Sequence, residues 1–308
     1  MAKSEAKSEG KSEFKKIRKL VEPYRITDGR KFRLKDIDPA DTGGLKSEFK
    51  GESKAMLARC VELLTDEQAR LYAQDRWGVL LIFQAMDAAG KDGTIKHVTS
   101  GIDPQGMQVY SFKAPSSEEL DHDFMWRCMR ALPERGRIGI FNRSYYEEVL
   151  AVRVHEEYLM KQKLPREVIT KKVWDERYQD IRSIERYLSR NGYLILKFFL
   201  HVSKKEQKKR FMERLDFPDK NWKFSATDAR ERQYWDAYMD SFEQMIRNTA
   251  TDYAPWHVIP ADNKWFTRLA VSDAVIDGME ALHLKYPTID EAKKKELAAA
   301  RKILMSER

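Results

Sequence analysis

Five short apolar runs divide the chain and alternate with segments whose apolar residues recur at helical spacing. The runs are Val79–Phe83, Met107–Phe112, Arg137–Phe141, Tyr193–Val202 and Trp256–Pro260. Near-continuous apolarity is typical of strands covered on both faces, and strands that alternate with helices form parallel sheets. The pattern therefore predicts an α/β three-layer sandwich, with a five-stranded parallel sheet and helices on both faces. Ligands of such sheets bind at the carboxyl ends of the strands.

Helical spacing is found between and beyond these runs. We expect helices at 47–76, 165–190, 228–247, 265–282 and 289–308. Pro165 suits a first helical turn, and Gly192 lies just past the end of that helix. The apolar residues of 165–190 recur on one face, which indicates a core-facing stripe rather than a ligand site.

The two ends of the chain differ from its middle. Residues 1–13 contain Lys-Ser-Glu three times. This composition cannot bury a core, so residues 1–20 are expected to be a disordered tail. Residues 21–285 are expected to form one domain, which is entered through an extended basic arm at 21–44. Residues 286–308 are expected to form a polar C-terminal helix.

Composition narrows the class of partner. The 308 residues are 42% hydrophobic and 11% aromatic and carry a net charge of +8, which indicates a folded protein with a polyanionic partner. Nucleic acid, a membrane surface and a phosphate-rich small molecule all fit that charge. Cys60 and Cys128 form no disulfide framework, which predicts a reducing, cytoplasmic location. No apolar run approaches bilayer-spanning length.

The first apolar run leads into a loop of small residues and Gly90-Lys91, before helical spacing begins at Thr94. This is the order of a phosphate-binding loop, in which backbone N–H groups and a lysine hold phosphates at a helix N-terminus. Relative to the usual pattern, Ala85 replaces the first glycine and Asp92 replaces Ser or Thr. A tight strand-to-helix turn is the alternative interpretation. The loop groups expected to bind phosphate belong to Ala88, Ala89, Gly90, Gly93 and Thr94.

Two carboxylates, those of Asp87 and Asp92, flank Lys91. Carboxylates beside phosphates are favourable where a hard cation bridges them, so both are candidate ligands of Mg²⁺. We therefore expect Asp87, Lys91 and Asp92 to be catalytic.

The third predicted strand ends in the polar pair Asn142-Arg143. A guanidinium at the end of a buried strand requires an anionic partner, and its fork geometry suits phosphate oxygens. We expect Arg143 to be catalytic and to bind phosphate. The alternative is a structural ion pair with Glu147 or Glu148. Arg153 is a weaker candidate of the same kind.

Further cations follow the second and fourth predicted strands. Lys113 would lie at the carboxyl end of the second strand, either as a phosphate contact or as a surface lysine. Arg210 and Arg214 share one helix face, and the next loop interleaves Lys220 and Lys223 with aromatic residues. We expect residues 203–228 to form a lid that closes over the transferring group. A nucleic-acid-binding surface and a plain surface loop are the alternatives.

Together these motifs resemble the polyphosphate kinase 2 family. The motifs are Gln-Ala-Met-Asp-Ala-Ala-Gly-Lys-Asp-Gly (84–93), Phe-Asn-Arg-Ser-Tyr-Tyr-Glu (141–147), the segments 198–211 and 221–225, and Ala-Pro-Trp-His-Val-Ile-Pro-Ala-Asp-Asn-Lys-Trp (254–265). The resemblance covers roughly residues 20–285. It implies a P-loop kinase-like fold akin to thymidylate kinase and phosphoryl transfer between inorganic polyphosphate and AMP, ADP or ATP. It further implies dependence on Mg²⁺ or Mn²⁺ and assembly as homodimers or homotetramers.

The resemblance also assigns residues. Those that match the family's two main motifs and its lid are Asp87, Gly90, Lys91, Asp92, Gly93, Arg143, Arg210, Arg214, Lys220 and Lys223. Arg143 would hold the acceptor phosphate, and Arg210 with Arg214 would offset the charge of the transition state. Asn142 departs from members with Asp at this position and resembles class III, which accepts both nucleoside mono- and diphosphates. Asn142 and Glu147 are accordingly counted with the nucleotide-binding residues.

Three other interpretations fit parts of the sequence. One is a nucleotide kinase that uses ATP as its donor. The second is a basic nucleic-acid-binding module, suggested by the net charge and the loop around Trp222. The third is a P-loop scaffold without activity, suggested by Ala85 in place of the first glycine. The acceptors could also include guanine nucleotides.

Overall fold

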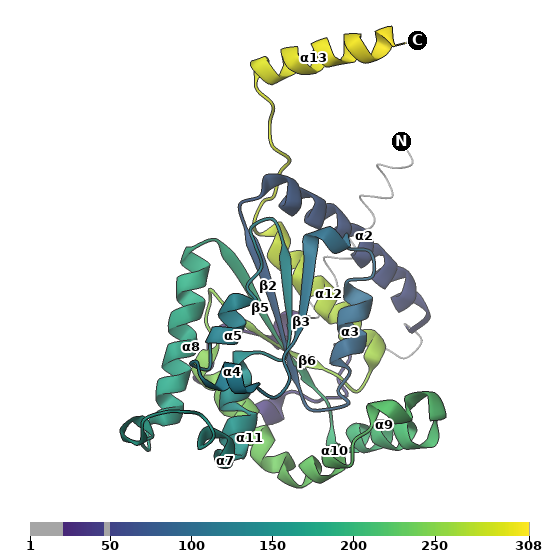
Figure 1. Cartoon of the computed structure of the whole chain (residues 1–308). Helices are drawn as coiled ribbons and strands as arrows, with labels where there is room; N and C mark the ends of the chain where they lie inside the picture. Colours follow the sequence, from purple (N-terminus) through teal and green to yellow (C-terminus); the bar gives the residue numbers. More distant parts are fainter. Residues whose placement is uncertain (1–20, 46–49, 308) are drawn as a thin grey trace.

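The computed structural model describes residues 21–45 and 50–307. A sheet forms its centre (Figure 1). The sheet has six strands in the order β1-β6-β5-β2-β4-β3. The strands are β1 (Arg25–Ile26), β2 (Gly78–Ala85), β3 (Met107–Ser111), β4 (Ile138–Asn142), β5 (Tyr193–His201) and β6 (Trp256–Pro260). Neighbouring strands pair in parallel except β1, which runs antiparallel to β6. The predicted α/β class and parallel sheet are thus confirmed.

The number of strands differs from the predicted five. The additional strand, β1, lies within the basic arm and places Arg25 opposite His257 at one edge of the sheet. Its two residues are too few to carry a periodic pattern, so the sequence held no signal for it. The arm is also fastened to the domain at Leu34, whose N–H donates to Glu243 at 2.8 Å.

Helices cover both faces of the sheet (Figure 1). One layer contains α2 (Lys50–Gln74), α3 (Lys91–Val98) and α12 (Lys264–Glu280), and the other contains α8 (Val173–Arg190) and α11 (Trp235–Thr249). Shorter helices follow the carboxyl ends of the strands: α4 (Ser117–Leu120), α5 (Trp126–Arg130), α6 (Ala151–Val154), α7 (Glu156–Leu159), α9 (Lys204–Asp216) and α10 (Ala226–Glu231).

Two helices differ from those that the sequence pattern predicted. The helix expected at 165–190 starts at Val173, and only the 3-10 turn Arg166–Val168 precedes it. Val173 is the first buried residue of its segment. Because helices in proteins are stabilised mainly by packing of an apolar face, the residues before Val173 do not extend α8. The helix expected at 228–247 is divided instead: α10 ends at Glu231, the 3-10 turn Arg232–Tyr234 follows, and α11 starts at Trp235.

The C-terminal region contains α13 (Glu291–Ser306), which projects away from the body of the domain (Figure 1). All of its residues are exposed. The tail at 1–20, for which disorder was expected, lies outside the described residues. None of the helices within 21–45 and 50–307 combines the length and the apolarity needed to cross a bilayer.

The carboxyl end of β2 lies where the order of strands reverses. β4 and β3 lie on one side of it, and β5 and β6 lie on the other. Phe83 of β2 pairs with Asn142 of β4 and with Phe198 of β5, so the three strands end at the same edge. In open parallel sheets this switch point is the usual ligand site.

Candidate active site

A tight loop, residues 86–90, connects β2 to α3. Ala88 (φ 60°) and Gly90 (φ 106°) both have left-handed backbone conformations. Glycine adopts such a conformation freely, whereas alanine is strained in it, so the surroundings of the loop must fix its shape. Lys91 begins α3, and its ammonium group donates to the carbonyl of Ala85 at 2.9 Å. The lysine thus folds back across the loop that it follows.

Arg210 on α9 braces this loop. Its guanidinium donates to four backbone carbonyls: Ala88 at 3.1 Å, Ala89 at 2.8 Å, Ala261 at 2.7 Å and Asp262 at 3.1 Å. Its Nε donates to Glu206 at 3.0 Å. These acceptors match the donor capacity of an arginine, so a direct contact with phosphate would require some of the bonds to break. The contacts of Arg210 are those of a residue that shapes the loop.

Arg143 reaches the loop from the end of β4. Its backbone is left-handed (φ 64°), and its N–H donates to the carbonyl of Phe83 on β2 at 3.0 Å. Its guanidinium donates to Asp87 at 2.7 Å and lies 3.5 Å from Glu147. The charge of Glu147, with a further contribution from Asp87, raises the pKa of Arg143. The pair with Glu147 that the sequence left as an alternative therefore coexists with a contact to the loop.

The neighbouring residue holds the second carboxylate. The amide of Asn142 donates to Asp92 at 2.8 Å. Asn142 and Arg143 therefore each hold one of the two carboxylates that flank Lys91. The sequence could place Asp87 and Asp92 near the lysine, but their partners on β4 depend on the pairing of β2 with β4.

Lys91 lies in a cluster with Asp87, Asp92, Asn142, Arg143 and Glu147. It is buried there, with 8% of its surface exposed. Burial is the main cause that lowers its pKa, to about 8, and the charge of Arg143 lowers it further. The carboxylates of Asp87, Glu147 and Asp92 oppose the shift. Lys91 and Arg143 thus lie close enough for their charges to act on each other.

The two carboxylates fit the needs of Mg²⁺. Among the described residues, no hydrogen bond engages the Oδ2 atom of Asp87 or of Asp92, since both use Oδ1 for the contacts above. Residues 21–45 and 50–307 contain no cluster of three or more His, Cys, Asp or Glu side chains that could enclose a metal ion. Mg²⁺ commonly binds through one or two carboxylates and completes its shell with phosphate oxygens and water. The same oxygen donors suit Mn²⁺.

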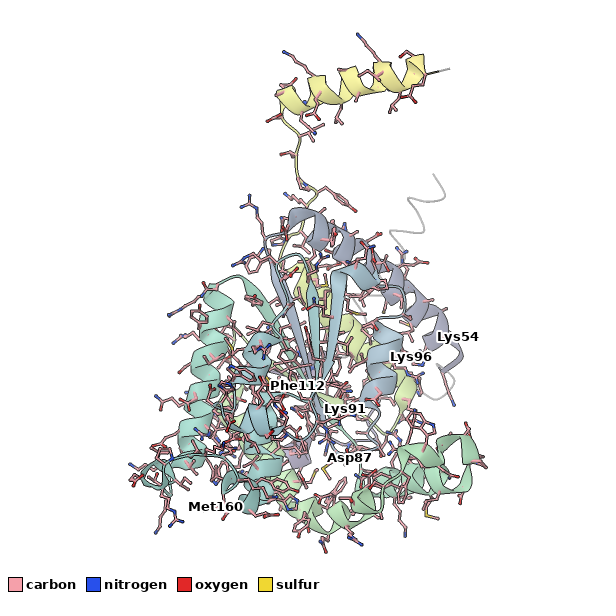
Figure 2. The ribbon with its side chains drawn as sticks, in the orientation of Figure 1. Lys54, Asp87, Lys91, Lys96, Phe112 and Met160 are labelled. Carbon is pink, nitrogen blue, oxygen red and sulfur yellow. The ribbon has the colours of Figure 1, made fainter. Side chains whose placement is uncertain are left out.

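A cavity of about 580 Å³ opens beside this cluster. Asp87, Arg143 and Glu147 form part of its wall. The remaining wall combines aromatic rings with charged groups, among them Phe112, Lys113, Arg127, Tyr145, His155, Tyr158, Asp228, Glu231 and Tyr238. Met160 lies at the lower left of the molecule in Figure 2, away from Lys91 and Asp87. Such a lining suits a ligand with both a ring and anionic groups.

One wall of the cavity joins the segment after β5 to the segment after β4. His155, between α6 and α7, contacts Glu231 of α10 at 2.9 Å, and the hydroxyl of Tyr238 donates to the same carboxylate at 3.1 Å. Burial raises the pKa of Tyr238, so its hydroxyl remains a donor. Sequence analysis missed these residues. Glu231 could have been suspected because it follows the predicted lid, whereas His155 stands in no recognisable motif.

Apart from Arg210, the predicted lid cations make their contacts away from the loop around Lys91. Arg214 donates to the carbonyl of Lys223 at 3.2 Å. The ammonium groups of Lys220 and Lys223 lie over the rings of Phe217 and Trp222, at 4.4 Å and 4.9 Å from the ring centroids. In this arrangement Arg214, Lys220 and Lys223 contact other residues of the lid.

Arg153 also lies away from the cluster. Its guanidinium donates to Asp240 at 3.1 Å and to the hydroxyl of Tyr178 at 3.4 Å, and it does not line the cavity. Lys113 is exposed and lies on the cavity wall. The structure therefore brings Lys113 toward the cluster and turns Arg153 toward α8 and α11.

The fold and the site together define an α/β protein of the P-loop kinase-like class, in which a central parallel strand leads through a Gly-Lys loop into a helix beside a ligand-sized cavity. Residues 47–287 match the family described as Polyphosphate kinase 2. The chain therefore belongs to the polyphosphate kinase 2 family, which confirms the resemblance found in the sequence.

Individual relatives match over nearly their whole length. The ADP-polyphosphate phosphotransferase of Rhodopseudomonas palustris is 52% identical over 287 residues, which cover 92% of this chain and 97% of the relative. The AMP/ADP-polyphosphate phosphotransferase of Meiothermus ruber is 43% identical over 279 residues, which cover 89% and 98%. The crystal structure of polyphosphate kinase 2 from Arthrobacter aurescens TC1 has a TM-score of 0.82 at 40% identity and covers 91% of this chain and 96% of that one.

Proposed function

We propose that the protein transfers the terminal phosphoryl group of inorganic polyphosphate to AMP and ADP, reversibly and with Mg²⁺. The observation that carries this proposal is the convergence of Lys91, Arg143, Asp87 and Asp92 beside a cavity large enough for a nucleotide. Phosphoryl transfer depends mainly on positioning and on neutralisation of charge. Lys91 and Arg143 supply positive charge directly, and Asp87 and Asp92 would supply it through a bound Mg²⁺. The names of the relatives support the choice of donor and acceptors.

The cavity takes the acceptor nucleotide in this proposal. Arg143 lies in its wall and binds the acceptor phosphate, while Phe112 and Tyr158 offer aromatic surface to the base. An acceptor phosphate oxygen is already anionic near neutral pH, so no strong general base is needed. Asn142 supports acceptance of both AMP and ADP, by its resemblance to class III. Assays with AMP, ADP, GMP and GDP would define the range.

The loop takes the donor's terminal phosphates. Lys91 and the backbone N–H groups of Ala88, Gly90 and Gly93 bind them, and Arg210 keeps the loop in shape. The N–H groups of Ala89 and Thr94, also expected to bind phosphate, instead donate to the carbonyls of Met86 at 3.2 Å and Gly90 at 2.9 Å. Asp87 and Asp92 hold Mg²⁺, which neutralises phosphate charge when bound. Closure of the part of the lid beyond Arg210 would bring Arg214, Lys220 and Lys223 over the transferring group and exclude water.

On the side of Lys91 away from Phe112, a basic strip offers a path for the rest of the donor. We use this name for Lys96 and His97 of α3 and Lys264 and Arg268 of α12, two helices that pack together. Burial and the charges of Arg268 and Lys96 lower the pKa of His97. Burial and the charges of Arg210 and Arg268 lower that of Lys264. Lys96 lies on the opposite side of Lys91 from Phe112 in Figure 2. Crowded cations of this kind favour a polyanion.

The basic strip predicts a selective effect on the donor. The combined variant Lys264→Ala/Arg268→Ala should raise the KM for polyphosphate about tenfold and weaken its dependence on salt, because fewer charges then attract the chain. The KM for ADP should stay within about twofold, since the acceptor cavity is untouched. Steady-state kinetics at several salt concentrations measure both. The matched control is Lys293→Ala/Lys294→Ala on α13; an equal effect there would exclude a specific strip.

Lys91 predicts a pH dependence. Its lowered pKa, about 8, means that the free enzyme loses this positive charge as the pH rises through 8. Because kcat/KM reports the ionisation of the free enzyme, kcat/KM for polyphosphate should fall above about pH 8. Bound phosphates favour the charged lysine, so the fall in kcat should begin at a higher pH. A pH profile of the wild type and of Lys91→Arg checks this. The expected fall lies about a unit and a half below pH 9.5. A kcat/KM for polyphosphate that stays constant up to pH 9.5 would therefore contradict the assignment.

One assay separates the proposal from its alternatives. Purified protein is supplied with ADP, Mg²⁺ and polyphosphate as the sole phosphoryl source, and ATP is measured. Formation of ATP supports the proposal and excludes an inactive scaffold. A requirement for ATP as the donor would favour an ordinary nucleotide kinase. Tight binding of oligonucleotides without turnover would favour the nucleic-acid-binding module.

A further inference from the structure

A fully buried ion pair lies beneath the candidate active site. Lys197 of β5 and Glu185 of α8 are both completely inaccessible to solvent, and their charged atoms are 2.7 Å apart. Lys197 also donates to the carbonyl of Thr249, at the end of α11, at 2.8 Å. The pair therefore ties together the central sheet and the two helices that cover one of its faces.

Two consecutive tyrosines bind this ion pair from the active-site side. The hydroxyl groups of Tyr145 and Tyr146 donate to Glu185 at 3.0 Å and 2.7 Å, and Lys197 donates to the hydroxyl of Tyr146 at 3.0 Å. Burial raises the pKa of both tyrosines well above the ordinary value, so both hydroxyls stay protonated and able to donate. The ring of Tyr146 packs edge-on against Trp256 at 4.8 Å.

The two tyrosines lie in the chain between the residues that face the site. Arg143 and Glu147, which contact each other at 3.5 Å, bracket Tyr145 and Tyr146 in the chain. Ser144 links the two sets, because its hydroxyl accepts the N–H of Tyr146 at 3.1 Å. One short segment thus carries two side chains into the core and two toward the loop, so a shift of either tyrosine must move Arg143 or Glu147.

Stability alone gives little reason for such a pair. Removing two charges from water is unfavourable, and a buried ion pair can often be replaced by apolar residues without loss of stability. A buried, fully bonded pair does fix geometry, because each member accepts only a few directions of approach. Arg143 needs such a fixed support because its own backbone is left-handed, a strained conformation for a residue other than glycine.

We infer that the Glu185–Lys197 pair, acting through Tyr145 and Tyr146, is a positioning device that holds Arg143 and Glu147 in register with the acceptor phosphate. None of its four members is assigned to contact the reacting phosphates, although Tyr145 also forms part of the wall of the acceptor cavity. This inference rests on the proposed function, in which Arg143 binds the acceptor. It concerns the acceptor side alone, since Lys91 and the basic strip bind the donor from other elements.

The test disconnects the segment from the pair and leaves both charges in place. Tyr146→Phe removes the hydroxyl that contacts Glu185 and Lys197 but keeps the ring against Trp256. We expect the KM for ADP to rise about five- to tenfold, because both buried hydrogen bonds of this hydroxyl are lost, while the KM for polyphosphate stays within about twofold. A merely structural role would lower the active fraction and change kcat without separating the two KM values.

Two further variants make the result decisive. Tyr24→Phe is the matched control, because Tyr24 is also buried and its hydroxyl donates to the carboxylate of Asp41, at 2.5 Å. It should leave both KM values unchanged. If Tyr146→Phe does not fold, Tyr145→Phe tests the same link, since Tyr146 and Lys197 then remain bonded to Glu185. A folded variant whose KM for ADP equals that of the wild type would overturn the inference.

Failure of this inference is distinct from failure of the proposed function. If only the inference fails, the wild-type protein still makes ATP from ADP and polyphosphate, and the folded tyrosine variants have the same KM for ADP as the wild type. If the wild type itself makes no ATP, the proposed function fails first. A second check is Tyr146→Phe in an Arg143→Ala background, with ADP affinity measured by calorimetry. The tyrosine should then have no further effect, because the group that it positions is gone.

Discussion

Lys91→Ala is expected to lower kcat by about 10²–10³-fold while the protein remains folded. Lys91 is the buried cation of the β2–α3 loop, and its ammonium group reaches across that loop to the carbonyl of Ala85. In the transition state it would face the charge that develops on the transferred phosphate, in a site from which water is largely excluded. Nothing else on the loop carries a positive side chain, so the loss should not be compensated locally.

The measurement is steady-state ATP formation from ADP and polyphosphate, with circular dichroism and thermal melting as checks of the fold. Removal of a partly desolvated charge should not destabilise the protein, because burial already disfavours the charged lysine. The matched control is Lys294→Ala on the exposed helix α13, which should retain full activity. Near-normal turnover by folded Lys91→Ala would remove the phosphate-binding role of the loop.

The second large effect is expected for Asp87→Asn. This change keeps the shape of the side chain but removes the charge that meets Arg143 at 2.7 Å. It also replaces one of the two carboxylates proposed to hold Mg²⁺ with a neutral amide. We expect kcat to fall by about 10²-fold or more, and the Mg²⁺ concentration for half-maximal activity to rise about tenfold.

A titration of activity against Mg²⁺ separates these two effects. Asp236→Asn, at an exposed position of α11, is the matched control and should leave the titration unchanged. The pKa of Asp228 gives an additional readout, because the charge of Asp87 contributes to raising it. In Asp87→Asn the pKa of Asp228 should therefore decrease. An unaltered need for Mg²⁺ in this variant would place the metal on other groups.

The sequence predicted the sheet well because each buried parallel strand is a nearly continuous run of apolar residues. The observed β2, β3, β4, β5 and β6 agree with the apolar runs to within two residues at each end, and Trp256–Pro260 agrees at both ends. The missed strand β1 depends on pairing with β6 rather than on any pattern of its own. The late start of α8 has a similar cause, since burial against distant elements decides where that helix begins.

The candidate site divides in the same way. Lys91, Asp87 and Asp92 lie within six residues of one another, so a local motif could reveal them. Arg143 could be suspected because a guanidinium at the end of a buried strand requires partners. The Glu185–Lys197 pair joins residues of two elements through tyrosines some forty to fifty positions away, and no local pattern records it. A lone lysine amid the apolar residues of β5 was the one signal available.

The contacts of Arg210 set a limit on how the lid can move. This residue lies in the middle of α9 and is fixed to the carbonyls of two separate loops. Any hinge that swings the tip of residues 203–228 would therefore lie beyond Arg210, in the second half of α9 or later. The moving part would carry Arg214, Lys220 and Lys223, whereas Arg210 would keep its position against the two loops.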